Sequence, residues 1–366
     1  MTEQHPDSAA TKPTDPDEIV IVLEPGDEYT HEPDEAENYN ESMYLNAFDL
    51  GLQGGGWFRL GNRVNEGYAE MTVCLYLPDG RVGFIYDRPK IDNNDAMSAG
   101  GLTISVVEPF EHLTVEYTGR VCLLDDPSQM ADPRTAFRNN PMVDCTVSLD
   151  YRAVSPMYGG KPQYADGREI EVEPGKSFAK AHYEQHCSVT GTITVGAADD
   201  ESTGTVMEID GLGLRDKSWG PRYWQALTWY RWLPMVFSDD FAMMLSVIDR
   251  GEGRAPSASG MVLVGDEYHK VIDCRVDADW NENGEQTTMR AWAKTAEREY
   301  ELTGEVLSMI PLRNRRTTAD GEQLQTRITE AMTRYECDGK VGVGMSEFLD
   351  QVVDGWPIGV PAPSGT

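Results

Sequence analysis

The feature that most constrains this chain is a period-two alternation of apolar and polar residues in short segments bounded by turn residues. In residues 71–77 the odd positions are apolar, residues 78–80 read Pro-Asp-Gly, and residues 81–86 return. This pattern predicts a β-hairpin. Similar strand-like segments recur at residues 113–118, 147–151, 189–195, 241–248, 274–278, 288–292, 328–335 and 341–345. Evenly spaced short strands of this kind predict an all-β fold, either a sandwich or a barrel.

Few other signals compete with this pattern. Only residues 131–139 predict a helix, and it is short. The sequence has no strand–helix–strand alternation, no P-loop and no Gly-rich phosphate-binding loop, which argues against nucleotide-dependent chemistry. It also lacks a G-x-S-x-G motif, so serine-hydrolase chemistry finds little support.

Charge is unevenly spread along the chain. Residues 1–49 hold fourteen acidic residues and only one base, Lys12. We expect residues 1–39 to form a disordered acidic tail, because the first part has too few apolar residues to offset the entropy of ordering. A short polar stretch at 197–202 then divides the ordered chain into two domains, at 40–200 and 201–355. Residues 356–366 are expected to form a loose tail.

The net charge of −31 limits the partners that this protein can have. Such a chain repels nucleic acid and anionic membrane surfaces. No run of about 18 apolar residues predicts a membrane span, and the acidic N-terminus lacks a secretory pattern, so we expect a cytoplasmic protein. No CxxC motif occurs, and we expect six reduced and partly buried cysteines: Cys74, Cys122, Cys145, Cys187, Cys274 and Cys337.

The sharpest local feature is the segment 211–233, GLGLRDKSWGPRYWQALTWYRWL, which holds half of the eight tryptophans. Aromatic ring faces attract cations, and neighbouring Arg and Asp side chains can hold a proton in a defined place. An aromatic pocket with one acid therefore suits the protonation of an alkene and the shelter of a carbocation. The alternative is a corner of the core, in which Arg215 and Asp216 only hold a loop in place.

A second candidate lies in residues 181–187, AHYEQHC. On a strand, His182, Glu184 and His186 share one face, and Tyr183 lies on the other. The two histidines would then be about 13 Å apart, too far to ligate one ion without a bend. A proton relay between Glu184 and His186 is therefore favoured over a metal site, and ordinary polar positions are the alternative.

Two weaker candidates lie nearer the C-terminus. Arg313, Arg315 and Arg316 could clamp a carboxylate or phosphate, but a surface role with local acidic partners is favoured. Glu330 shares a strand face with apolar neighbours. If it is buried there, its pKa is raised and it can serve as an acid.

The segment GLRDKSWGPR at residues 213–222 resembles the G-x-R-D-H-S-W-G-x-R signature of the carotenoid 1,2-hydratase / AttH-like family. Four further segments are similar to a bacterial branch of that group: FRLGNR at 58–63 with GYAE at 67–70, HYEQH at 182–186, RNR at 313–315 and GVGMSEFLDQ at 342–351. Together the resemblance covers most of residues 40–355.

The resemblance implies a fold of two lipocalin-like (calycin) antiparallel β-barrels packed together. It also implies activity on hydrophobic, unsaturated small molecules, with a role for Trp219. Lys217 stands where the family has histidine. The family's downstream Tyr–Asp pair has no counterpart, since the same spacing falls at residues 244–246.

We therefore predict a cofactor-independent lyase or isomerase, hydratase- or cyclase-like, for a lipophilic terpenoid, steroid or polyketide. Its site is expected near the junction of the two barrels, without a metal or other cofactor. The candidate catalytic residues are Asp216, Lys217, Glu184 and His186. The candidate substrate-binding residues are Arg215, Trp219, Arg222, Trp224, Tyr230 and Tyr183.

Two other classes of function compete with this prediction. A lipocalin-like barrel can carry a lipophilic ligand without transforming it. The tryptophan cluster can also be purely structural. Apart from the small molecule, we expect no nucleic-acid or membrane-spanning partner, and formation of a homodimer is left open.

Overall fold

The protein is nearly all β, as the alternation predicts. The computed structural model describes residues 15, 17–171, 173, 178–197, 204–251, 253–317 and 321–362. In that part of the chain one α-helix, α1 (Pro133–Asn139), lies within the predicted helical segment. Short 3-10 turns are η1 (Pro25–Glu28), η2 (Val64–Glu66), η3 (Pro127–Ala131) and η4 (Trp224–Ala226).

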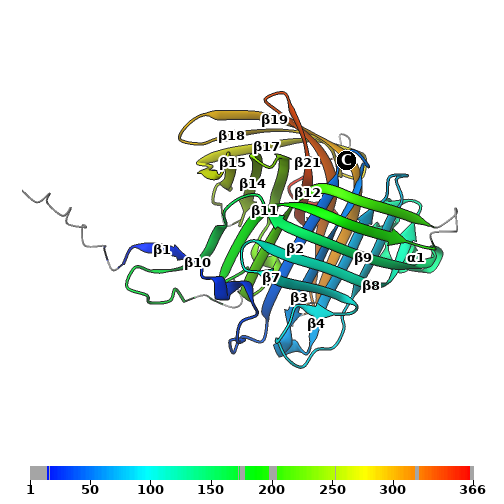
Figure 1. Ribbon diagram of the computed structural model, residues 1–366, viewed down its shortest axis with the longest axis horizontal. Helices are drawn as coiled ribbons and strands as arrows, with labels where there is room; N and C mark the ends of the chain where they lie inside the picture. Colours follow the sequence, from blue (N-terminus) through cyan, green and yellow to red (C-terminus); the bar gives the residue numbers. More distant parts are fainter. Residues whose placement is uncertain are drawn as a thin grey trace, which may run out of the picture.

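The strands form two large antiparallel sheets (Figure 1). The first sheet contains β1 (Ile19–Val22), β2 (Tyr39–Asp49), β3 (Gly54–Arg63), β4 (Tyr68–Tyr76), β5 (Val82–Asp87), β6 (Ser98–Ala99), β7 (Leu102–Glu108), β8 (His112–Leu124), β9 (Met142–Ala153), β10 (Tyr158–Tyr164), β11 (Ala181–Val195) and β12 (Thr205–Pro221). The second contains β13 (Trp229–Ser238), β14 (Phe241–Asp249), β15 (Ser257–Val264), β16 (Glu267–Lys270), β17 (Asp273–Trp280), β18 (Gln286–Lys294), β19 (Glu299–Thr317), β20 (Gln323–Cys337), β21 (Lys340–Val353) and β22 (Trp356–Pro357).

The predicted hairpin at residues 71–86 is confirmed as β4 and β5. The strand-like segments at 274–278 and 288–292 pair as β17 and β18, and those at 328–335 and 341–345 pair as β20 and β21. In the first sheet β9 pairs with both β8 and β11, so the pairings run from β2 through β5, β8, β9, β11 and β12 back to β2.

Strand β2 shows how the two sheets meet. Both of its faces are buried. Met43 and Leu45 point into the core of the first sheet, whereas Tyr44 and Phe48 pack with residues of the second sheet such as Met345. A strand covered on both sides loses the polar face of a surface strand, which explains its continuous burial.

The N-terminal region differs from the predicted acidic tail. Residues 19–28 contain β1 and η1, and β1 pairs with β10 in a ribbon that extends from the body of the molecule (Figure 1). Glu28 is buried against Arg215. This ion pair neutralises the buried charge, an effect that composition does not register. Residues 1–14 and 16 of the predicted tail lie outside the described residues.

The division of the chain also differs from the sequence prediction. The predicted boundary falls at residues 198–203, which lie outside the described residues. Beyond it, β12 belongs to the first sheet because it pairs with β11 and β2. The sheets therefore change between β12 and β13, while the division into two domains stays a prediction. Near the C-terminus, β22 pairs with β21, and residues 363–366 are not described.

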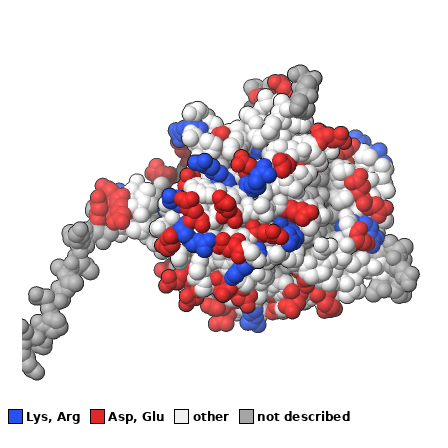
Figure 2. Space-filling view, turned by 90° about the horizontal axis from the view of Figure 1, so that it is seen from above, with Lys and Arg blue, Asp and Glu red and all other residues white. Residues whose placement is uncertain are grey.

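Acidic side chains are spread among basic ones on the face shown in Figure 2. All six cysteines are free and buried, as expected. In the described part of the chain, no helix is long and apolar enough to cross a membrane.

Candidate active site

A pocket of about 490 Å³ opens where the two sheets meet. Its walls come from β2, β3, β11 and β12 of the first sheet and from β13, β14, β20 and β21 of the second. Much of the lining is aromatic: Tyr44, Phe178, Trp224, Tyr230 and Trp232. Three serines, three arginines, three acidic residues and His182 also line it, so the pocket combines aromatic rings with polar groups. Small-molecule sites combine apolar walls with polar groups that orient the ligand.

The alternation of strand β12 sorts the signature residues onto two faces. Asp216 and Ser218 line the pocket. Arg215, Lys217 and Trp219, at the intervening positions, point to the opposite face, because successive side chains on a strand alternate. Only half of the signature therefore faces the pocket.

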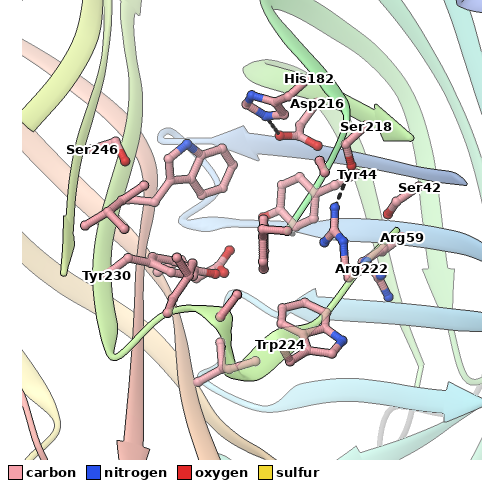
Figure 3. A pocket seen from close by; sticks show the side chains of 18 of the residues that line it. Ser42, Tyr44, Arg59, His182, Asp216, Ser218, Arg222, Trp224, Tyr230 and Ser246 are labelled. Carbon is pink, nitrogen blue, oxygen red and sulfur yellow. Dashed lines mark hydrogen bonds and ion pairs between the residues drawn. The ribbon is translucent and has the colours of Figure 1, made fainter. Parts of the chain in front are cut away.

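Asp216 forms a hydrogen bond with Nε2 of His182 on the neighbouring strand β11, where His182 is paired with Ser218 and Glu184 is paired with Asp216 (Figure 3). Of the His182 side chain, 47% is accessible, and this surface lines the pocket. Loss of hydration acts to lower the pKa of His182, but the charge of Asp216 and the hydrogen bond outweigh it and raise the pKa to about 9. At neutral pH His182 is therefore an imidazolium.

Glu184 lies directly behind this pair. It is buried, and its Oε1 lies 3.8 Å from His182 Nε2 and accepts a hydrogen bond of 2.8 Å from Trp232 Nε1. Burial raises the pKa of Glu184, and the charge of His182 opposes that rise. Its Oε2 has no hydrogen-bond partner among the described residues. Glu184 therefore interacts with the charge of His182, and it does not line the pocket.

Two more carboxyl groups face the pocket from the second sheet. Glu330 on β20 and Glu347 on β21 are directly paired across the hairpin and both line the pocket. Burial raises the pKa of Glu330 to about 8. Burial and then the charge of Asp216 raise the pKa of Glu347 to about 8. Both groups are therefore protonated at neutral pH and can donate a proton.

Two guanidinium groups occupy another wall. Arg59 Nη1 pairs with Glu70 at 3.1 Å. Arg222 is buried, its Nη2 donates to Ser218 Oγ at 2.6 Å, and it lies 4.3 Å from the centre of the Phe178 ring. Burial and the nearby charge of Arg59 lower the pKa of Arg222 to about 9.

Four of the sequence-predicted site residues contact the N-terminal segment, defined here as residues 24–31, and do not line the pocket: Arg215, Lys217, Trp219 and Tyr183. Arg215 Nη1 contacts both oxygens of Glu28, at 2.7 and 2.6 Å. Lys217 Nζ donates to the backbone oxygens of Asp27 and Tyr29, both at 2.6 Å.

The rest of that contact involves Trp219 and Lys217. The Trp219 ring stacks on His31 with 4.1 Å between the ring centres. Lys217 also pairs with Glu41 at 2.9 Å, and burial lowers its pKa although Glu41 opposes the change. The prediction grouped these side chains with Asp216, but the strand alternation separates them. A catalytic role for Lys217 stays a prediction that this placement does not favour.

His186 lies apart from the pocket. Tyr268 Oη is 2.8 Å from Nδ1, and Nε2 is 3.2 Å from the backbone oxygen of Met243. Burial lowers the pKa of His186 to about 4, so the ring is neutral and satisfied by hydrogen bonds. Glu184 lies near His182 instead. The relay between Glu184 and His186 stays a prediction that this placement does not favour.

The remaining candidates are placed as follows. Arg222, Trp224 and Tyr230 line the pocket, and so does Glu330, while their roles in binding or catalysis stay predictions. Arg313 pairs with the exposed side chain of Asp132, which agrees with the favoured surface role.

Several lining residues were missed from the sequence. Among them are Ser42, Tyr44, Arg59, Ser218, Trp232 and Glu347. For Glu347 a signal existed. With a two-residue turn at Asp338 and Gly339, Cys337 pairs with Lys340, and the same register pairs Glu330 with Glu347. For Arg59, the sequence singles out only its segment, residues 58–63. Its position at the pocket could not be predicted, because β3 is joined to the distant strand β12 through β2 only in the folded sheet.

The same corner of the pocket could hold a cation. His182, Glu184 and Asp216 offer potential ligand atoms within 4.8 Å of one another. The sequence prediction was that no metal is bound. The three groups also form a self-consistent arrangement of one imidazolium with two acids, in which the histidine nitrogen is engaged by Asp216.

The family model described as Domain of unknown function (DUF7064) matches residues 24–352. No curated protein matches the sequence. Among solved structures, CghA with Sch210972 is 13% identical with a TM-score of 0.52, over 86% of this chain and 89% of that chain.

Kievitone hydratase from Nectria haematococca is 9% identical with a TM-score of 0.50, over 94% of this chain and 97% of that chain. A putative AttH from Nitrosomonas europaea is 12% identical with a TM-score of 0.47, over 95% of this chain and 100% of that chain. CghA and kievitone hydratase show a shared fold, and the family resemblance drawn from the sequence is confirmed at that level.

Proposed function

The chain belongs to the DUF7064 family, and we propose that it is a cofactor-independent lyase or isomerase, hydratase- or cyclase-like, acting on a lipophilic unsaturated small molecule. The observation that carries the proposal is the placement of two paired carboxyl groups, Glu330 and Glu347, in one aromatic pocket with the His182–Asp216 pair.

The pocket suits such a molecule in size and lining. Its volume of about 490 Å³ lies within the range of ordinary small-molecule sites. The rings of Trp224, Tyr230 and Trp232 present faces that stabilise a passing positive charge. A bound lipophilic molecule that displaced water from the pocket would strengthen the electrostatic contacts inside it.

The chemistry proposed is protonation of a carbon–carbon double bond. The carboxyl proton of Glu330 or Glu347 passes to one alkene carbon, leaving a cation on the other and a carboxylate on the protein. In hydration, a water oxygen bonds to the cationic carbon and its extra proton goes to Asp216, from which the first carboxylate is reprotonated. In isomerisation, Asp216 takes a proton from a neighbouring carbon instead.

In this proposal His182 and Glu184 tune Asp216 instead of touching the substrate. The imidazolium holds the carboxylate in place, and Glu184 supplies a second acid 3.8 Å from the ring. Such a chain of acid, histidine and acid can store and redistribute a proton during turnover.

The comparisons support this class of function. Kievitone hydratase is by its name a hydratase, and CghA was solved with the small molecule Sch210972. We further propose that the first sheet is a closed lipocalin-like barrel, since its pairings return to β2, and that the second sheet forms a similar barrel.

The experiment begins with native mass spectrometry of the purified protein and identification of any extracted ligand. That ligand, or a close analogue, is then incubated with the protein in D₂O. An enzyme that works by protonation incorporates solvent deuterium into the product. A lipophilic carrier returns the ligand unlabelled, and this result would refute the proposal.

The test variant is Asp216→Asn, and the matched control is Asp210→Asn on the same strand, where Asp210 is exposed. Asp216→Asn should lose deuterium incorporation while ligand affinity stays nearly unchanged. Asp210→Asn should behave as the wild type. Equal loss of binding and folding in Asp216→Asn would instead support a structural role.

A further inference from the structure

The pocket wall formed by β3 and by residues 218–224 holds two guanidinium groups with unused donors. Within the described part of the chain, Nη2 of Arg59 and Nε of Arg222 are both buried without a hydrogen-bond partner. Both residues line the pocket, and Figure 3 shows their side chains next to each other on one side of it, close to Ser42. Buried donors are nearly always satisfied in folded proteins, so two neighbouring exceptions call for an acceptor.

The charges of this wall do not cancel. Arg59 is neutralised by Glu70. Arg222 is more than nine-tenths buried, and among the residues that the structure describes no carboxylate forms an ion pair with it. Asp216 is near enough to influence it, but one oxygen of Asp216 is bonded to His182. A buried cation without a counter-ion is unusual, above all in a chain of net charge −31.

Aromatic rings pack against both guanidinium groups. The Arg222 guanidinium lies 4.3 Å from the Phe178 ring centre and 5.3 Å from that of Trp224. Arg59 lies 5.6 Å from the Trp224 ring centre. Stacking covers the flat faces of a guanidinium and leaves its N–H groups, which lie in the plane, free for an acceptor.

Gly61 makes room for this arrangement. A Cβ atom at Gly61 would meet Arg59 Nη2 at 2.8 Å. Since Gly61 follows Arg59 by two residues on β3, both face the pocket side, and the missing side chain lets the guanidinium lie across the strand. The position of Arg59 therefore depends on a glycine at this point.

We propose that Arg59 and Arg222 bind an ionised carboxylate of the substrate, so that the substrate is an unsaturated lipophilic acid. A carboxylate has two planar acceptor oxygens, which match guanidinium donors better than any neutral group does. The inference rests on the proposed function, because it names the class of substrate for the same pocket. With the head group held at Arg59 and Arg222, the hydrocarbon lies along Trp224, Leu227 and Tyr230.

The test compares a fluorescent polyene acid, cis-parinarate, with its neutral methyl ester in titrations at neutral pH. The wild type should bind the acid about tenfold or more tightly than the ester, because charge-assisted hydrogen bonds are lost with the ester. Arg222→Gln should reduce the ratio of the two affinities to near unity, mainly by weakening the binding of the acid. Circular dichroism and urea denaturation verify that the variant is folded.

Arg250→Gln is the matched control, because Arg250 also lines the pocket but is exposed. It should keep the preference for the acid. Equal affinities of acid and ester in the wild type, or an equal effect of Arg250→Gln, would overturn the assignment and leave the proposed function standing. Absence of binding by both probes would overturn the lipophilic pocket itself, and the proposed function with it.

Discussion

The buried ion pair between Glu28 and Arg215 gives the sharpest prediction about stability. Arg215 Nη1 reaches both carboxylate oxygens, at 2.7 and 2.6 Å, and neither side chain is more than 2% exposed. Glu28→Gln removes the negative charge, so the guanidinium keeps only neutral oxygen partners such as Gln185 among the described residues. Breaking a buried pair in this way costs about 3–5 kcal/mol of the free energy of unfolding.

Urea denaturation of Glu28→Gln, Arg215→Met and the double variant measures this cost. The double variant should be less destabilised than the sum of the single ones, by about 2 kcal/mol or more, because no charge is then left unpaired. Glu32→Gln, an exposed position in the same region, should change stability by no more than about 0.5 kcal/mol. The reasoning is refuted if Arg215→Met unfolds like the wild type but abolishes turnover.

Three further changes test the pocket. The pKa of Glu330 is about 8 in the folded protein against an ordinary 4.5. The wild type therefore loses stability as the pH rises between these two values, by roughly 1.4 kcal/mol per pH unit. Urea denaturation should show Glu330→Gln to be more stable than the wild type at pH 8 but not at pH 5. Gly61→Ala should displace the Arg59 guanidinium. In a fluorescence titration this variant should bind cis-parinarate about tenfold more weakly than the wild type does, and bind the methyl ester equally well. Trp232→Phe removes a hydrogen bond that lowers the pKa of Glu184. One limb of the pH–turnover profile should therefore shift to higher pH by about one unit.

Much of the fold could be predicted from local pattern. Alternation and turn residues place the hairpins β4–β5, β17–β18 and β20–β21, because both signals act over a few residues. The pairing of β9 with both β8 and β11 could not be predicted in this way, since it joins strands whose order depends on the whole sheet. The all-β fold class was therefore predicted correctly, whereas the order of the strands in the sheets could be learned only from the structure.

The candidate site was predicted in part for a similar reason. Asp216, Arg222, Trp224 and Tyr230 lie at the pocket because the tryptophan-rich segment passes through the junction of the sheets. Acidic composition predicts a disordered tail for the N-terminal segment, yet Glu28 is neutralised by a residue 187 positions away. Composition cannot register a partner at that distance along the chain.

The alternation of residues along a strand also predicts which side chains share a face. A strand assignment for residues 205–221 separates Asp216 and Ser218 from Arg215, Lys217 and Trp219 without any knowledge of the fold. It does not say which face is the pocket. That choice depends on which side the second sheet covers, and the structure answers it through Trp232, which reaches Glu184 from β13.

Solvent-deuterium incorporation tests the central claim most directly, namely that this pocket transfers protons to a lipophilic unsaturated ligand. The ligand that co-purifies with the protein is incubated in D₂O with the wild type and with Glu330→Gln, Glu347→Gln and Asp216→Asn. The account predicts label at carbon in the wild type and its loss in Asp216→Asn and in at least one of the glutamine variants, all of which still bind the ligand. Recovery of unlabelled and unchanged ligand from the wild type would contradict it.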